Sequence, residues 1–556
     1  MARCLVPFLA SLPSAAWAAV GIPPAADAGR MAHDLEVPAA PKAEPGAIPA
    51  PSTAEVPAPP GADQMHFVLS RIVLEGAHRY PEHELLAPYQ SLIGTEIPLS
   101  KIYDAASDIA RRYREDGYAF VNVEVPPQRI ENGIVRIRVV EGFIARVVME
   151  GVDETSILKN TEEQIVAMRP LQVRTLEEIL LLLNDLPGLN VKAVVEPDPI
   201  DATEGALLLR LTAERKPVSA GVSVDNYSSR YTGRWQITPQ VQYNDMFTAY
   251  DKTVLAGVSS IPDSLARYFS VQHSIQLDLR TSVTFNAAFS HSEPGYKLAV
   301  DGIISNARDF SVTIYHALLR TREKNASINL KLDANNPSSD ILDDTPLYRD
   351  RIRALRLGGS FDMVDPWQGV DLFTATLSKG LNILDARPTG SFDLSRAQGR
   401  SDFTKLEWSA SRLSNIGGGF SLYALTQGQY ATSPLLSSEQ FGYGGQLIGK
   451  AYDPSEITGD RGVSFTTELR YDNVPEIRGA KAQPFLFYDI GKVWNLSRGS
   501  NNISAASAGA GFHLQINQRM YGSATIAWPL TRKPQAAQAG NAFAPRIGVS
   551  LSYTLE

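Results

Sequence analysis

Cysteine is almost absent from this sequence. The 556 residues contain one, Cys4, and it lies in an N-terminal segment that we expect to be removed. A mature chain without thiols has no disulfide scaffold, no cysteine-ligated zinc and no cysteine nucleophile.

Long apolar runs are also missing. No stretch approaches the 18 or so uninterrupted apolar residues of a transmembrane helix. This excludes a helical membrane protein, but a membrane β-barrel remains possible because its lipid-facing residues alternate with polar ones. The net charge of -8 argues against a nucleic-acid partner, which would favour a basic surface.

Motifs that carry enzyme chemistry are missing too. There is no G-x-S-x-G elbow, P-loop, H-E-x-x-H or cysteine-based metal spacing. Three of the eight histidines, His66, His78 and His83, lie near one another in sequence, but not at a metal-ligand spacing. We therefore expect no enzymatic activity, no catalytic residue, no cofactor and no metal.

The N-terminus begins MARCLVPFLASLPSAAWAAVG, with a basic residue, a short apolar run and a small-residue cleavage site. Residues 1–18 are therefore expected to be a signal peptide. Residues 19–64 are rich in proline and alanine, which predicts an extended linker. Within it, ADAGRMAHDLE (26–36) could form a short helix that inserts elsewhere as a plug.

A motif then repeats. RIVLEG (71–76) returns as RVVMEG (146–151), at a period of about 75 residues, and each copy is followed by helical and then strand patterns. In the first copy, Ile102, Ile109 and Tyr113 share one face of a helix with Ser100 as its possible N-cap. The sequence predicts two small modules, residues 65–142 and 143–215, each with the order β-α-α-β-β.

The remaining residues, 216–556, alternate apolar and polar side chains. RWQITPQVQYND (234–245) and SVTFNAAFS (282–290) are examples, although a soluble sandwich would show the same alternation. About 20 residues per strand and loop gives about 16 strands, an even number as single-chain barrels require. Pro239 predicts a bulge or strand end near it.

The last residues, PRIGVSLSYTLE, place large apolar side chains on one face and small polar ones on the other. This pattern fits a closing barrel strand. The chain ends in Leu-Glu, whereas the usual assembly signal of bacterial outer-membrane barrels ends in an aromatic residue.

A leader, a proline-rich linker, two such modules and a barrel resemble the outer-membrane transporters of two-partner secretion (TpsB, ShlB/FhaC/HecB-like haemolysin activation/secretion proteins). The resemblance implies a mainly β fold, a transmembrane antiparallel barrel preceded by two α+β POTRA domains in the periplasm. It implies secretion of an exoprotein that carries a β-helical secretion domain. Outer-membrane lipid and the barrel assembly machinery would be further partners.

Two other functions compete with this interpretation. An insertase for other outer-membrane proteins would carry more POTRA units, typically three to five in such relatives, and a passive porin would carry none. The two modules predicted here favour secretion over both alternatives.

The resemblance extends to a loop. In the wider superfamily, a V-R-G-Y/F loop motif faces the aspartate of an F-x-D-x-G strand motif. This chain has G-K-A-Y-D at 449–453 and F-Y-D-I-G at 487–491, so Lys450 and Ala451 replace the arginine and glycine. Lysine lacks the planar fork of arginine, and the strength of its pair with Asp489 depends on whether the pair is wet or desolvated.

We therefore expect residues 441–463 to fold into the lumen as a latch or gate, with Asp489 facing inward because a lipid-facing carboxylate is costly. Residues 459–462 would form a tight turn that returns the chain to the barrel. The candidate latch residues are Lys450, Tyr452, Asp453, Gly459, Asp460, Arg461, Gly462, Asp489 and Gly491.

Overall fold

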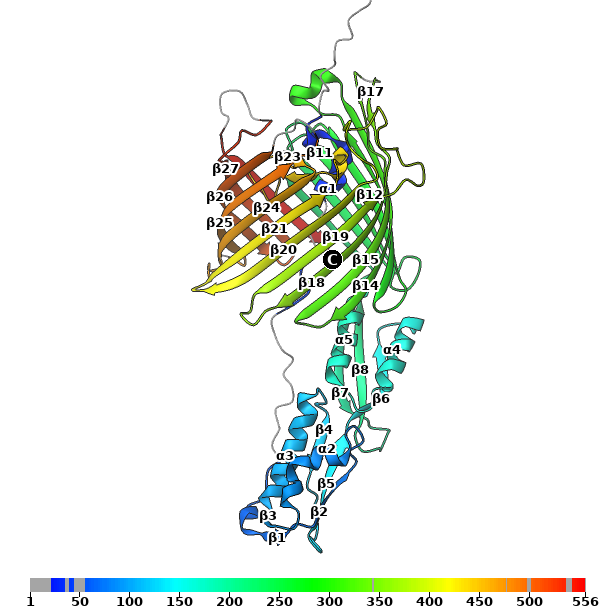
Figure 1. Ribbon diagram of the computed structural model, residues 1–556, viewed down its shortest axis with the longest axis vertical. Helices are drawn as coiled ribbons and strands as arrows, with labels where there is room; N and C mark the ends of the chain where they lie inside the picture. Colours follow the sequence, from blue (N-terminus) through cyan, green and yellow to red (C-terminus); the bar gives the residue numbers. More distant parts are fainter. Residues whose placement is uncertain are drawn as a thin grey trace, which may run out of the picture.

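The computed structural model describes residues 22–35, 40–44, 56–342, 345–476, 478–497, 502–536 and 543–555. The expected signal peptide lies outside these residues, as does part of the linker. Two small α+β units stand in a column below a β-barrel (Figure 1).

The first unit is built on a three-stranded sheet in the order β2-β5-β4, in which β2 and β5 are parallel. A short pair, β1 and β3, lies beside it. Helix α3 buries Ile102, Ile109 and Tyr113, as their spacing predicts. Its N-cap is Leu99, so the prediction of Ser100 as the cap is wrong. The elements are β1 (His66–Val68), β2 (Arg71–Glu75), α2 (Glu82–Leu86), β3 (Glu96–Pro98), α3 (Ser100–Glu115), β4 (Val121–Glu124) and β5 (Ile134–Glu141).

The second unit repeats the plan with the sheet order β6-β8-β7. Its two helices pack leucine and isoleucine side chains against the sheet. The order β-α-α-β-β holds in both units, and the first adds β1 and β3. The elements are β6 (Phe143–Glu150), α4 (Ser156–Val166), α5 (Val173–Asn184), β7 (Leu189–Pro197) and β8 (Ala206–Arg215).

Sixteen antiparallel strands close the barrel, with β28 paired to β9. A hairpin of β16 (Ser338–Ile341) and β17 (Thr345–Arg349) extends above the wall. The barrel strands are β9 (Val218–Asp225), β10 (Trp235–Asn244), β11 (Lys252–Ile261), β12 (Ala266–Gln276), β13 (Thr281–Ser292), β14 (Ile304–Arg320), β15 (Lys324–Asn335), β18 (Ile352–Val364), β19 (Val370–Gly380), β20 (Thr404–Gly417), β21 (Phe420–Ala431), β24 (Arg461–Tyr471), β25 (Lys481–Trp494), β26 (Ile503–Asn517), β27 (Met520–Pro529) and β28 (Arg546–Leu555).

Alternation orients the strands as the sequence predicts. On β25, Phe487 and Asp489 are buried, whereas the intervening Tyr488 is exposed on the outer wall. The prediction of a bulge or strand end near Pro239 is wrong, because β10 continues through it without a register shift. Its pairing with β9 is continuous, and its ladder with β11 lapses at residues 238–239 and resumes in the same register.

Charged contacts join the second unit to the end of the barrel that faces it. Helix α5 and the residue after it provide the carboxylates, and turn arginines provide the cations. The pairs are Glu177 with Arg322 at 2.6 Å, Glu178 with Arg280 at 2.9 Å, and Asp185 with Arg320 at 2.9 Å.

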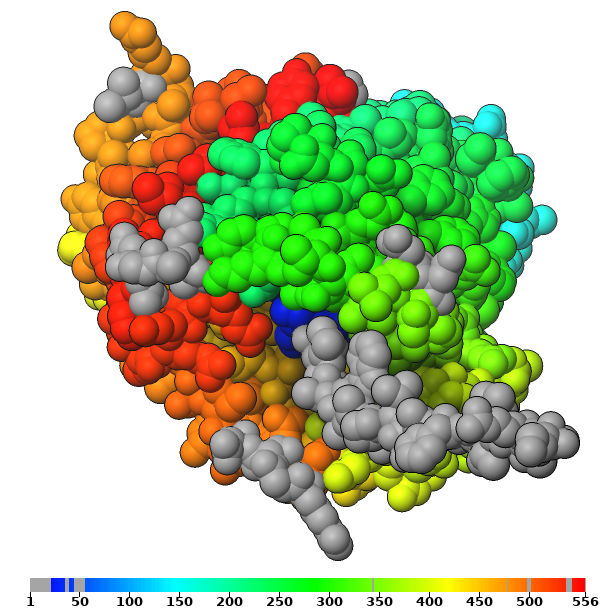
Figure 2. Space-filling view, turned by 90° about the horizontal axis from the view of Figure 1, so that it is seen from above, coloured from blue at the N-terminus to red at the C-terminus, as the bar shows by residue number. Residues whose placement is uncertain are grey.

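Two segments occupy the barrel interior. One is the connection between β21 and β24, and the other is α1 (Ala28–Asp34), which follows the 3-10 helix Pro24–Ala26. Seen from above, the N-terminal segment lies in the middle of the ring of strands (Figure 2). Among the described residues, none of the helices has the length and apolar character needed to cross a membrane.

Candidate functional site: the luminal loop and helix α1

The luminal loop, defined here as residues 432–460, connects β21 to β24. It contains the 3-10 helix Ser437–Glu439 and a small sheet of β22 (Phe441–Tyr443) and β23 (Ile457–Gly459). Its apolar side chains pack on the inner faces of β25 to β27. The loop therefore begins before the expected residue 441 and ends at Asp460, because residues 461–463 already belong to β24.

Lys450 lies between two buried carboxylates. Its Nζ is 3.3 Å from Asp489 Oδ1 and 3.3 Å from Glu468 Oε1. The ammonium group also lies 4.6 Å from the ring centroid of Phe487. The three charged side chains are at most 7% exposed, so this pair is desolvated.

Asp489 receives donors from the loop and from neighbouring strands. The backbone N–H of Lys450 donates to Oδ2 at 2.9 Å, while its Nζ faces Oδ1. Thr466 donates to Oδ1 at 2.6 Å, and Ser507 to Oδ2 at 3.0 Å. Lysine thus contacts both carboxylate oxygens without an arginine fork, because its backbone amide serves as the second donor.

Tyr452 and Asp453 attach the loop to the neighbouring strand β26 and to the closing strand β28. The Tyr452 hydroxyl donates to the Ala506 carbonyl at 3.0 Å. Asp453 pairs with Arg546 at 2.9 Å and accepts from Ser229 at 2.7 Å. Arg546 is buried at the start of β28. Its role could not be predicted from sequence, because nothing in a strand pattern marks a luminal partner.

The predicted tight turn at 459–462 is wrong. The chain bends at the single residue Asp460 between β23 and β24 and enters the barrel strand without a separate turn. Glycines here allow close packing instead, because a Cβ on Gly462 would lie 2.0 Å from the Phe441 ring. Gly459 packs in the same way against Val493.

Asp460 and Arg461 point to different partners. Asp460 is fully buried and pairs with Arg396 from the long loop between β19 and β20. It also accepts from the backbone N–H of Leu435 at 2.9 Å. The Arg461 guanidinium lies instead over the Tyr430 ring, 4.1 Å from the centroid.

A second buried ion cluster, around Glu439, was not predicted from the sequence. Glu439 in the luminal loop pairs with Arg356 at 2.7 Å and with Lys405 at 2.9 Å, and Arg356 also pairs with Asp333 at 2.6 Å. Polar residues facing inward on β15, β18 and β20 were its only signal. The luminal loop is therefore attached to the wall by the Lys450 cluster, by the Glu439 cluster and by the pair of Asp453 with Arg546.

Helix α1 is fastened chiefly to the loop. Arg30 is 1% exposed and donates to the carbonyls of Ser437 at 2.6 Å and Gln440 at 3.0 Å. Its guanidinium also donates to Ser455 Oγ at 3.0 Å. At the other end, the Asp27 side chain accepts from Tyr348 at 2.5 Å. The two luminal segments form one connected plug.

Among the described residues, no group of three or more histidine, cysteine or acidic side chains could hold a metal ion. The chemistry of the site is that of buried charge pairs, backbone hydrogen bonds and close ring packing. Such an arrangement fixes one conformation of the lumen.

Comparisons with known proteins agree with this architecture. Residues 206–514, more than half of the chain, match the family model "Haemolysin secretion/activation protein ShlB/FhaC/HecB". Residues 67–142 match the model "POTRA domain, ShlB-type".

Individual relatives are distant but extensive. The heme/hemopexin transporter protein HuxB of Haemophilus influenzae is 23% identical over 444 residues, 77% of each chain. The outer membrane transporter CdiB of Dickeya dadantii is 22% identical, over 78% of this chain and 77% of that one. The solved structure of CdiB from Escherichia coli has a TM-score of 0.72 at 19% identity, over 93% of this chain and 94% of that one.

Proposed function

Because the chain belongs to the haemolysin secretion/activation protein family and is an outer-membrane transporter that secretes a partner exoprotein, we propose that the luminal loop is the latch of its pore. The observation that carries this proposal is Lys450 held between Asp489 and Glu468. The latch residues are Lys450, Tyr452, Asp453, Asp460 and Asp489, with Gly459, Gly462 and Gly491 as packing positions and Arg461 at the wall.

The energetics of a buried pair support a latch. Removing one partner of a desolvated ion pair leaves an uncompensated charge and costs about 3–5 kcal/mol, whereas an exposed pair contributes about 0–1 kcal/mol. Because Lys450 and Asp489 are buried, the loop is held firmly in its luminal position.

The client is proposed to be an exoprotein with a β-helical secretion domain, captured in the periplasm by the two POTRA units. The sheet of each unit has an edge strand, β4 in the first and β7 in the second, and an edge strand offers unpaired backbone groups to an extended chain. Exposed apolar side chains around the barrel suit outer-membrane lipid. We further propose that the barrel assembly machinery inserts the barrel into the membrane. The proposed secretion involves no enzymatic step.

The test is a secretion assay with variants of the latch. We expect Lys450→Met and Asp489→Asn each to lower the fraction of exoprotein in the medium at least fivefold, because passage requires a defined loop position. Lys492→Met, the same change on the outer face of β25, is the matched control. Barrel levels in the outer membrane are measured in parallel. Normal secretion by both latch variants at normal barrel levels would contradict the proposal.

A further inference from the structure

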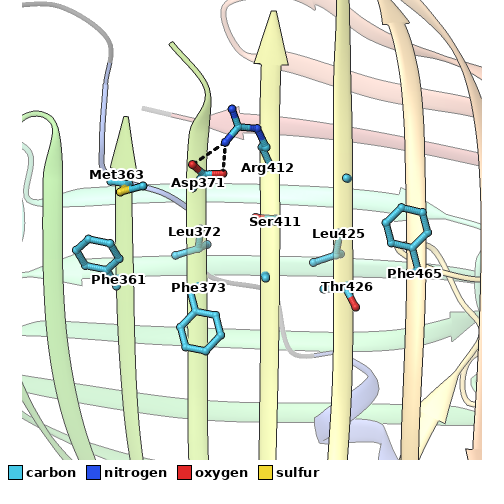
Figure 3. A pocket seen from close by; sticks show the side chains of 12 residues that line it. Phe361, Met363, Asp371, Leu372, Phe373, Ser411, Arg412, Leu425, Thr426 and Phe465 are labelled. Carbon is cyan, nitrogen blue, oxygen red and sulfur yellow. Dashed lines mark hydrogen bonds and ion pairs between the residues drawn. The ribbon is translucent and has the colours of Figure 1, made fainter. Parts of the chain in front are cut away.

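A shallow pocket of about 310 Å³ lies on the outer wall of the barrel, across β19, β20, β21 and β24 (Figure 3). Its floor is made of small side chains, Ala410, Ala424 and Thr426. Phe373 and Phe465 border it on either side. Strand pairing places these residues on one face, since Ala410 is opposite both Phe373 and Thr426.

The two ends of the pocket differ in chemistry. Beyond the pocket toward the extracellular side, the Trp408 ring lies across Gly428, where an added Cβ would be 2.1 Å from the ring. At the other end lies Arg412, beside the turn that joins β18 to β19. From Trp408 to Arg412 the strand rises about 13 Å, so the pocket takes part of one acyl chain.

The Arg412 end lies at the periplasmic boundary of the wall. The turn at 365–369 is on the same side of the barrel as the POTRA units (Figure 1). Trp367 in that turn is 79% exposed, and exposed tryptophan is enriched at membrane–water interfaces. A lipid in this pocket would therefore belong to the periplasmic leaflet.

Charge at this end selects the headgroup. Arg412 pairs with Asp371 at 2.9 Å and with Asp365, while its Nε donates to Ser414 at 2.8 Å. Two carboxylates and one guanidinium leave one negative charge in excess. The Asp371 side chain is 28% exposed, so it can accept a further donor from a ligand.

We propose that this pocket is a binding site for phosphatidylethanolamine of the periplasmic leaflet. Its ammonium group donates to Asp371, the adjoining phosphate lies near the exposed side of Arg412, and one acyl chain fills the groove over Ala410. An anionic lipid without an ammonium group, such as phosphatidylglycerol, meets the excess negative charge and binds less well.

Native mass spectrometry of the full chain, released from detergent containing equal amounts of both lipids, tests the proposal. We expect one phosphatidylethanolamine to remain bound preferentially. Ala410→Phe fills the groove and should lower its retention at least tenfold, with Ala410→Leu as a second variant. Asp371→Asn should abolish the preference between the two lipids.

The control is Ala287→Phe, the same change on the outer face of β13, where Ala287 lies between exposed Phe285 and Phe289. Heat-modifiable migration on a gel confirms that each variant has a folded barrel. Equal retention by folded Ala410→Leu and wild type, an equal loss in Ala287→Phe, or a preference for phosphatidylglycerol would each overturn the site.

Discussion

At the residue scale, the substitution of lysine for the expected arginine changes how the loop is held. A guanidinium would contact a carboxylate through two parallel donors. Here the Lys450 backbone amide donates to Oδ2 of Asp489 and its Nζ donates to Oδ1. The same Nζ also pairs with Glu468. The ammonium is thus shared by two carboxylates, and Asp489 keeps two donors from residue 450 without the fork.

A double-mutant cycle measures this coupling. We expect Lys450→Met and Asp489→Asn to lower the free energy of unfolding by about 3–5 kcal/mol each, with a coupling energy within the range of about 0.5–3 kcal/mol measured for contacting residues. The free energies of unfolding are obtained from urea titrations in which the folded fraction is measured by migration on a gel. The exposed pair of Arg351 and Asp385 is the matched control, for which we expect coupling of at most about 1 kcal/mol. Equal coupling in the two pairs would mean that the latch is solvated.

Gly491 tests close packing rather than charge. An added Cβ would lie 2.2 Å from the Tyr443 ring, so Gly491→Ala must displace β22. We expect a loss of about 1–3 kcal/mol and faster hydrogen exchange in the luminal loop. Gly257→Ala is the control, because the nearest atom there is 3.7 Å away. Unchanged exchange in Gly491→Ala would show that the ring does not hold the loop.

At the element scale, periodicity predicted the strands well and the interior poorly. Alternation identifies a strand and its faces, as β25 shows, because each side chain meets either lipid or lumen. The repeat of RIVLEG and RVVMEG correctly marked β2 and β6. Each of these inferences uses residues that are close in sequence.

Features that depend on distant residues were missed or misread. The glycines at 459 and 462 were interpreted as turn residues, but they accommodate Phe441 and Val493. Arg546, which pairs with Asp453, lies 93 positions away, and no local pattern connects them. Helix α1 was considered as a plug, yet the loop carbonyls that accept from its Arg30 are more than 400 residues further along the chain.

Helix α1 gives a prediction at this scale. Arg30→Met removes its donors to the luminal loop, so we expect the helix to leave the lumen more often. Single-channel recordings in a planar bilayer should then show longer open times and higher mean conductance than wild type. His33→Ala, an exposed change in the same helix, should not differ from wild type. Unaltered conductance in Arg30→Met would show that α1 does not obstruct the pore.

At the scale of the whole molecule, the linker, the second POTRA unit and the barrel meet at one carboxylate. Asp185 pairs with Arg320 of the barrel and with Lys42 of the linker, both at 2.9 Å. The adjacent Ala43 backbone N–H donates to Asp362 on β18 at 2.7 Å. These contacts attach residues 42–43 of the linker to both the second POTRA unit and the barrel wall.

The most direct test of the central claim is comparative proteomics of the culture medium and the outer membrane, in cells that lack this protein and carry either the wild type or Lys450→Met. We expect one large exoprotein to be absent from the medium without the protein, restored by the wild type, and strongly reduced with Lys450→Met, while other outer-membrane barrels stay at normal levels. Depletion of many membrane barrels would instead identify an assembly factor and contradict the account.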